Sequence, residues 1–338
     1  MTSFTPFDLT TFSKLLKTLE TETLLKRKEI LAGVGEHASV YEPKGKELSL
    51  LTTAMLLEGI HFDLTYTPFH YLGFKTVSVV VSDLCAMNAE PVQIQVSLGL
   101  PNRISTEMTE QFFTGVSDAC VYYNLQLTKA DATACHHLLA ISVSALGRQL
   151  NHERIMKSGA NKGDLICVTG DLGAAVAGLR ILMREKKQWQ EESGTDFQPD
   201  LEGYDHLLRR QLKPQARTDF RKAVVNSKLL PTSLTQVKNG LITDLKSLLI
   251  ASKHSAEVYS PAIPIALETR KVADEMNEDV DKYVFYGGED FELLFTIPQD
   301  QEPMFRKVFD DFVVIGKITH PDGNLKINTG EETILIEV

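Results

Sequence analysis

Cysteine and long apolar stretches are scarce in this chain. Its four cysteines show no C-x-x-C spacing, which argues against a disulfide scaffold in a chain of 338 residues. No uninterrupted apolar run is long enough to span a bilayer. The start, Met-Thr-Ser-Phe-Thr-Pro-Phe-Asp, holds neither the basic nor the apolar segment of a secretion signal. We therefore expect a cytoplasmic protein without a membrane partner.

Positive charge is also in deficit. The chain has 35 Lys and Arg against 45 Asp and Glu, a net charge of −10 at pH 7. This balance argues against a nucleic-acid partner or an anionic membrane surface. A phosphate-bearing ligand needs local help from glycine amides, a few basic residues or a divalent metal. The length is large for one hydrophobic core, so we expect two domains.

Several well-known catalytic motifs are missing. The sequence contains no Walker A loop, no H-E-x-x-H and no nucleophile elbow. Residues 33–38, Gly-Val-Gly-Glu-His-Ala, approach a dinucleotide fingerprint, but that fingerprint follows a strand and residues 26–31 have a helical pattern. The two alternatives are a glycine loop that touches phosphate by another geometry and a flexible turn.

Hydrophobic periodicity predicts a mixed α/β chain. The first part has predicted strands at 48–57, 92–100 and 141–145, and predicted helices at 71–88 and about 105–123. After a turn-rich link at 158–164, the second part has a predicted strand at 165–168, helices at 170–183 and about 241–253, and closing strands that begin near 291.

Carboxylates stand in unexpected places in this pattern. Residues 287–295, Gly-Gly-Glu-Asp-Phe-Glu-Leu-Leu-Phe, form an acidic double-glycine turn that leads into a strand. It is either a solvated hairpin end or the polar wall of a ligand site. Asp83 stands inside an apolar helix, where a carboxylate costs free energy unless it is paired, bound to a cation or on a solvated stripe. The loop 58–63 places His61 between two carboxylates, as a ligand-lining loop or an exposed turn.

Taken in order, these segments resemble the thiamine-monophosphate kinase family. Its superfamily includes aminoimidazole ribonucleotide synthetase and selenophosphate synthetase. The resemblance lies in segments 33–35, 52–62, 81–89, 141–147, 168–173 and 287–295. It implies an α/β (α+β) fold of the aminoimidazole ribonucleotide synthetase type, with domains at 1–148 and 149–338. It also implies a homodimer whose N-terminal sheets pair into a barrel.

The family reaction transfers the γ-phosphoryl group of ATP to thiamine monophosphate, with several Mg²⁺ (magnesium) ions held by an Asp cluster. The resemblance assigns metal ligation to Asp83, Asp131 and the longer substitute Glu36, whereas His37, Ala54 and Asn239 occupy family Asp positions. It assigns nucleotide or phosphate contacts to Gly35, Thr53, Lys129 and Lys238, and substrate contacts to His61, Asp63, Glu289 and Asp290.

The lost carboxylates weaken the expected magnesium site, because each removes a charge that attracts the cation. Lys129 and Lys238 can contact phosphate oxygens but cannot offer oxygen ligands. Three hypotheses follow. The chain is a kinase with an impaired metal site, or a catalytically silent paralogue that binds a nucleotide or phosphorylated metabolite or pairs with an active subunit, or a related enzyme with a changed substrate.

Overall fold

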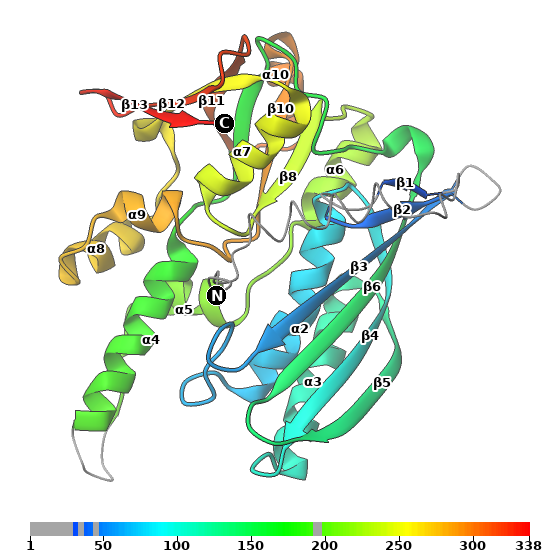
Figure 1. Ribbon diagram of the computed structural model, residues 1–338, viewed down its shortest axis with the longest axis vertical. Coiled ribbons are helices and arrows are strands. Elements are labelled where there is room, and N and C mark those ends of the chain that lie inside the picture. Colours follow the sequence, from blue (N-terminus) through cyan, green and yellow to red (C-terminus); the bar gives the residue numbers. More distant parts are fainter. Residues whose placement is uncertain (1–29, 33–36, 43–46, 192–197) are drawn as a thin grey trace, which may run out of the picture.

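Two β-sheets with flanking helices form the protein (Figure 1). The computed structural model describes residues 30–32, 37–42, 47–191 and 198–338. The chain passes from the first sheet to the second between Leu150 and Leu165. The division into domains at 1–148 and 149–338 stays a prediction.

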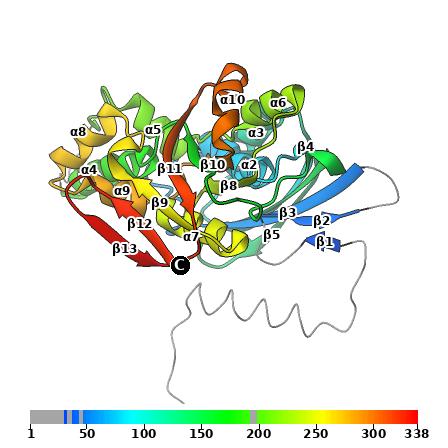
Figure 2. The same ribbon diagram turned by 90° about the horizontal axis from the view of Figure 1, so that it is seen from above.

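The first sheet has six strands in the order β1-β2-β3-β6-β4-β5. Their bounds are β1 Ile30–Ala32, β2 Ser39–Tyr41, β3 Glu47–Leu57, β4 Glu90–Pro101, β5 Gln126–Cys135 and β6 Ala140–Leu150. The helices α2 (Phe69–Cys85) and α3 (Thr106–Tyr123) cover one face (Figure 2). The strands predicted at 48–57, 92–100 and 141–145 are confirmed. The helical pattern predicted at 26–31 is wrong for residues 30–31, which belong to β1, where Ile30 pairs with Tyr41; residues 26–29 lie outside the described part of the chain.

Helix α2 is buried on all sides between the first sheet, α3 and the second half of the chain. Every residue from Leu72 to Cys85 is buried. The two helices touch through glycines: a Cβ on Gly73 would lie 2.0 Å from the Phe112 carbonyl, and one on Gly115 would lie 1.8 Å from the His70 carbonyl. This close packing holds the polar residues of α2 at fixed positions.

The second sheet has seven strands in the order β13-β12-β9-β11-β7-β10-β8. Their bounds are β7 Leu165–Thr169, β8 Ser233–Val237, β9 Ser255–Tyr259, β10 Glu292–Ile297, β11 Phe312–Thr319, β12 Asn324–Asn328 and β13 Thr333–Glu337. The helices are α4 Ala174–Glu191, α5 Asp205–Leu212, α6 Thr218–Ser227, α7 Leu241–Ser252, α8 Leu267–Glu275, α9 Val280–Phe285 and α10 Glu302–Val308. The predicted helix at 170–183 starts later and runs further than expected.

The hydrophobic core is continuous between the two sheets. One cluster of buried side chains extends from Leu50 and Val143 of the first sheet to Phe295 and Phe312 of the second. Strands β8 and β10 are buried along their whole length. Because this core fixes β8 against α2, side chains from distant parts of the chain meet there. Among the described helices, none combines the length and apolar character needed to cross a bilayer.

Candidate functional site

A polar cavity of about 380 Å³ lies where α2, β3, β8 and α7 meet. Its lining is His37, Thr52, Thr53, Asp83, Lys157, Lys238, Asn239, Thr243, Asp244 and Ser247. The structure thus brings together five positions that the sequence singled out, from four separate segments. We call it the Asp83 cavity.

Asp83 is at the centre of a hydrogen-bond network. Its side chain is 6% exposed. Gln236 Nε2 donates to Asp83 Oδ1 at 2.5 Å, and Lys238 Nζ lies 3.4 Å from the same oxygen. Thr52 Oγ1 donates to Oδ2 at 3.1 Å. Burial raises the pKa of Asp83, and the Lys238 charge opposes that rise. Both carboxylate oxygens therefore already have protein partners.

His37 is neutral in this network. Its Nδ1 accepts from Gln236 Nε2 at 3.3 Å, so Nε2 carries the proton and donates to Thr235 Oγ1 at 2.7 Å. Burial holds the pKa of His37 well below its ordinary value, and the charges of Lys157 and Lys238 act in the same direction. The imidazole thus adds no charge to the cavity at neutral pH.

Asp244 holds the loop that carries Lys238. Its Oδ2 accepts from the main-chain N–H groups of Lys238 and Asn239, each at 2.7 Å, and Oδ1 accepts from Asn239 Nδ2 at 3.0 Å. Gly240 follows with φ of 92°, and a Cβ there would lie 2.7 Å from the Gly287 carbonyl. Only glycine fits this left-handed close approach, which brings the acidic turn against the Asp83 cavity.

These residues do not fit a magnesium ion. The described residues include no group of three or more His, Cys, Asp or Glu side chains that could hold a metal. Asp83 is engaged by Gln236, Thr52 and Lys238, and Ala54 packs partly buried against the core from β3. Mg²⁺ needs several oxygen ligands at octahedral positions.

Two of the predicted metal or phosphate residues, Asp131 and Lys129, do not line the cavity. Both lie exposed on β5, an edge strand. Because β5 is at the far edge of the sheet, their expected roles at a metal and phosphate site stay predictions. Gly35 and Glu36 lie outside the described residues.

The acidic turn is not a solvated hairpin end. It links α9 to β10, and Asp290 is 1% exposed. Asp290 accepts hydrogen bonds from the main-chain N–H groups of Gly173 at 2.9 Å and Ala175 at 3.2 Å, at the start of α4. Burial raises the pKa of Asp290 to about 6. Its carboxylate is enclosed by protein, which corrects the expectation that it contacts substrate.

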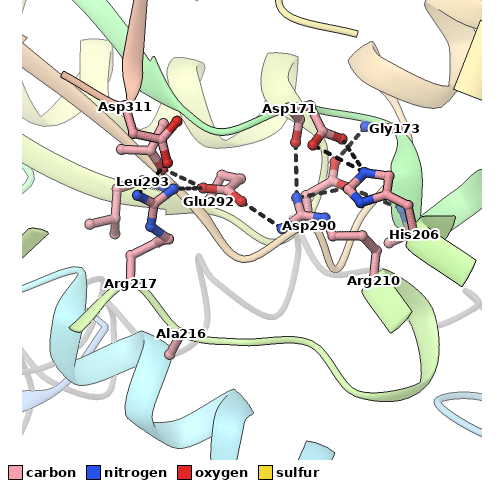
Figure 3. Close-up of polar contacts among 12 residues, drawn as sticks. Asp171, Gly173, His206, Arg210, Ala216, Arg217, Asp290, Glu292, Leu293 and Asp311 are labelled. Carbon is pink, nitrogen blue, oxygen red and sulfur yellow. Dashed lines mark hydrogen bonds and ion pairs between the residues drawn. The ribbon is translucent and has the colours of Figure 1, made fainter. Parts of the chain in front are cut away.

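Glu292 lies at the centre of the buried ion network drawn in Figure 3. Its side chain is 4% exposed, and it accepts from Arg210 at 2.5 Å, Arg217 at 2.9 Å and Thr169 Oγ1 at 2.5 Å. Arg217 also contacts Asp311 at 2.7 Å. The network fastens α5 and the segment before α6 to the second sheet, so it supports the site without lining it.

Glu289 lines a second cavity of about 320 Å³ together with His61 and Asp63. Lys75 Nζ, from α2, lies 2.6 Å from Glu289 Oε2 and 3.3 Å from the His61 carbonyl. Asp63 Oδ2 pairs with Lys186 of α4 at 2.5 Å. Three of the four predicted substrate residues are therefore neighbours. We call this the Glu289 cavity.

A larger cavity of about 870 Å³ shares Tyr66 with the Glu289 cavity. Tyr71 and Trp189 are among its other lining residues, as are Glu185 and Lys186. We call it the Trp189 cavity. The aromatic side chains offer faces to a flat or cationic ligand.

Sequence reasoning missed three residues of these sites. Lys75 has the same feature in the sequence as Asp83, a charged side chain inside an apolar helix, and this feature could have identified it. Gln236 and Lys157 carried no signal, because a polar residue at a strand end or in a turn is ordinary. Only their proximity to Asp83 and His37 gives them significance.

Comparison with known proteins agrees with this architecture. Residues 35–149 match the family model "AIR synthase related protein, N-terminal domain". The thiamine-monophosphate kinase of Aquifex aeolicus is 31% identical over 291 residues, covering 86% of this chain and 87% of the relative. The Escherichia coli K12 enzyme is 29% identical over 276 residues, covering 81% and 78%.

Solved structures give the same result. The structure of AaThiL complexed with AMPPCP and TMP superposes with a TM-score of 0.79 at 28% identity, covering 98% of this chain and 97% of that one. The hydrogenase maturation protein HypE in complex with ATP shares the fold alone, with a TM-score of 0.65 at 14% identity, covering 95% and 89%. The expected fold of the aminoimidazole ribonucleotide synthetase type is thus confirmed, and the chain belongs to the thiamine-monophosphate kinase family.

Proposed function

We propose that this protein binds ATP and thiamine monophosphate and forms thiamine diphosphate. An oxygen of the substrate phosphate bonds to the γ-phosphorus of ATP, and the bond from that phosphorus to the β,γ-bridging oxygen breaks, releasing ADP. The 31% identity to the Aquifex kinase across 86% of the chain carries the proposal. The substrate phosphate is ionised near neutral pH, so the step needs positioning and charge neutralisation more than a general base.

The Asp83 cavity and the Glu289 cavity bind different ligands. The nucleotide phosphates lie in the Asp83 cavity, near Lys238 and Thr53. Thiamine monophosphate lies in the Glu289 cavity, near His61 and Asp63. The two cavities adjoin at the main chain, where Glu289 N donates to the Lys238 carbonyl at 2.9 Å. Binding at both sides brings the two phosphate groups together, which is the largest contribution this geometry can make.

The thiamine rings extend toward the Trp189 cavity. A thiazolium cation is attracted to aromatic faces, and Tyr66, Tyr71 and Trp189 supply them. Glu185 adds a carboxylate to the same lining. Magnesium has no step in this proposal, because the described lining of the Asp83 cavity does not fit its oxygen coordination.

A direct test uses the only tryptophan of the chain, Trp189. Titration with thiamine monophosphate should change its fluorescence, and ATP alone should change it much less. Incubation of both ligands with the protein, followed by chromatography, should then show thiamine diphosphate and ADP in equal amounts. A fluorescence change without any product would support binding of thiamine monophosphate and contradict the proposed kinase reaction.

A second candidate is a silent paralogue that binds these ligands without turnover. The ion pair of Lys238 with Asp83 favours it, because that pair occupies the carboxylate that the resemblance assigns to metal. Turnover of about 1 s⁻¹ or faster, a normal kinase rate, would exclude this candidate. Binding of both ligands without detectable product would support it.

We also propose a homodimer built on the first sheet. Strand β5 is an edge strand whose residues are largely exposed on both faces. On the sheet face opposite α2, Leu51 is 55% exposed and Met55 is 60% exposed. An unpaired edge beside exposed apolar side chains favours association with a second copy.

A further inference from the structure

We propose that the Asp83 cavity binds the phosphate groups of its ligand by direct ion pairs with Lys238 and Lys157, without a divalent cation. This inference rests on the proposed binding of ATP and concerns how the same site neutralises phosphate charge. It follows from three observations: where the two lysines lie, how few carboxylates remain, and how the remaining ones are occupied.

Lys238 is placed to exchange one anion for another. Its Nζ lies 3.4 Å from Asp83 Oδ1, and its side chain is 31% exposed. Its main chain is held by Asp244 at 2.7 Å, so the ammonium group stays at the cavity while its stem keeps some freedom. The contact to Asp83 is longer than an ideal charged hydrogen bond. A phosphate oxygen can therefore compete for Lys238.

Lys157 brings a second positive charge from the link between the sheets. It lines the cavity and is 8% exposed. Its charge adds to the lowering of the His37 pKa by burial and opposes the rise of the Asp244 pKa that burial causes, so it acts on both sides of the cavity. The two ammonium groups are the charged donors of the lining, because the Thr52 hydroxyl already donates to Asp83 and the Thr53 hydroxyl to the Val143 carbonyl.

Negative charge in the lining is already satisfied inside the protein. Asp244 accepts two main-chain N–H groups and the Asn239 amide, and Asp83 accepts from Gln236 and Thr52. These bonds lessen their repulsion of a bound anion. A magnesium ion meets the opposite situation, because it would lie beside two lysines, and the described carboxylates of the lining are already engaged by protein donors. In this cavity the two lysines supply the positive charge that a metal ion would otherwise bring to the phosphates.

The test is calorimetric titration of the full-length protein with AMPPCP, once with EDTA and once with excess Mg²⁺. We expect dissociation constants that agree within about threefold in the two buffers, since the site needs no metal. Lys238→Gln should weaken AMPPCP binding about tenfold or more in EDTA, the loss of one charge-assisted phosphate contact. Lys246→Gln, on helix α7 that follows the Lys238 loop but outside the cavity lining, should leave it unchanged.

Lys157→Gln provides the second variant, with far-ultraviolet circular dichroism confirming that each variant is folded. It should also weaken binding in EDTA. A loss of tenfold or more on removing Mg²⁺ from the wild type would overturn the inference and leave the proposed kinase intact. Metal-independent binding that both cavity variants retain would overturn the assignment to these lysines. No AMPPCP binding in either buffer would defeat the proposed function and the inference with it.

Discussion

Lys75 Nζ lies 2.6 Å from Glu289 Oε2, and this ion pair joins α2 to the turn that precedes β10. The same ammonium group donates to the carbonyl oxygens of His61 and Gln211, each at 3.3 Å. Lys75 is 2% exposed. One buried cation thus holds three separate segments around the Glu289 cavity, which gives that cavity a defined shape before a ligand arrives.

Lys75→Met should destabilise the protein by roughly 1–3 kcal/mol, because two carbonyl groups and a carboxylate lose their donor. Urea unfolding at neutral pH measures the change. Lys317→Met is the matched control: its pair with Glu257 is at the surface and screened by solvent, so its loss should cost much less than that of Lys75. Equal costs for the two variants would show that burial of Lys75 has no special effect.

Glu292→Gln should cost about 3 kcal/mol of stability, because it leaves Arg210 and Arg217 buried without their shared carboxylate. Chemical denaturation followed by circular dichroism gives the value. The control is Glu302→Gln, which breaks an exposed pair with Arg306 on one helix and should cost less than about 1 kcal/mol. A neutral effect of Glu292→Gln would mean that the arginines find other partners.

Asp290 should make stability fall as pH rises. Its pKa in the folded protein is about 6, above the ordinary value of 3.8, since burial favours the neutral acid. The folded state therefore binds more protons between these values. The stabilisation is fully present below the unfolded pKa and is lost as pH rises through the folded pKa.

Asp290→Asn removes this titration. The difference in unfolding free energy between wild type and Asp290→Asn should shift against the wild type by up to about 3 kcal/mol from about pH 4 to about pH 7. Denaturant unfolding of both proteins across this range measures it. A difference that stays constant with pH would contradict the raised pKa.

Restoring carboxylates should restore a metal site. The variant combines His37→Asp, Ala54→Asp and Asn239→Asp, at the family Asp positions, with Lys238→Ser, which removes the lysine that pairs with Asp83. We expect Mg²⁺ to bind this variant about tenfold tighter or better than the wild type, because added carboxylates supply both charge and oxygen ligands. Calorimetric titration with MgCl₂ measures the gain, and unchanged affinity in a folded variant would show that other residues prevent metal binding.

Met55→Glu should weaken the proposed dimer. Met55 lies opposite Ser142 on the uncovered face of the first sheet, and a carboxylate there would be brought close to its copy. Light scattering coupled to size exclusion should give a dimer mass for wild type and a lower mass for the variant. Lys307→Glu on α10, exposed and remote from this sheet, is the control. A monomeric wild type would remove the proposal.

Much of the fold could be predicted from periodicity. Strand β3 at 47–57 and helix α3 at 106–123 match their predictions closely, because each buries one face against the core. Asp83 could also be identified, since a carboxylate in an apolar helix must be compensated. What compensates it could not, because Gln236 lies 153 residues away in sequence and belongs to the other sheet.

The acidic turn at 287–290 shows where a prediction from local sequence fails. In sequence the turn looks solvated or ligand-facing, yet Asp290 is sealed beneath α4 and Glu292 between two arginines. Lys129 lies on β5 at the outer edge of its sheet, and its phosphate contact stays a prediction.

By itself, the sequence determined the family and the main strands and helices, because these are properties of residue type and order. The tertiary structure alone decided which charges meet. Packing of β8 against α2 brings Lys238 and Gln236 to Asp83, and the neighbouring fold brings Lys75 to Glu289. Electrostatic interaction depends on distance and burial, and neither can be read from positions along a chain.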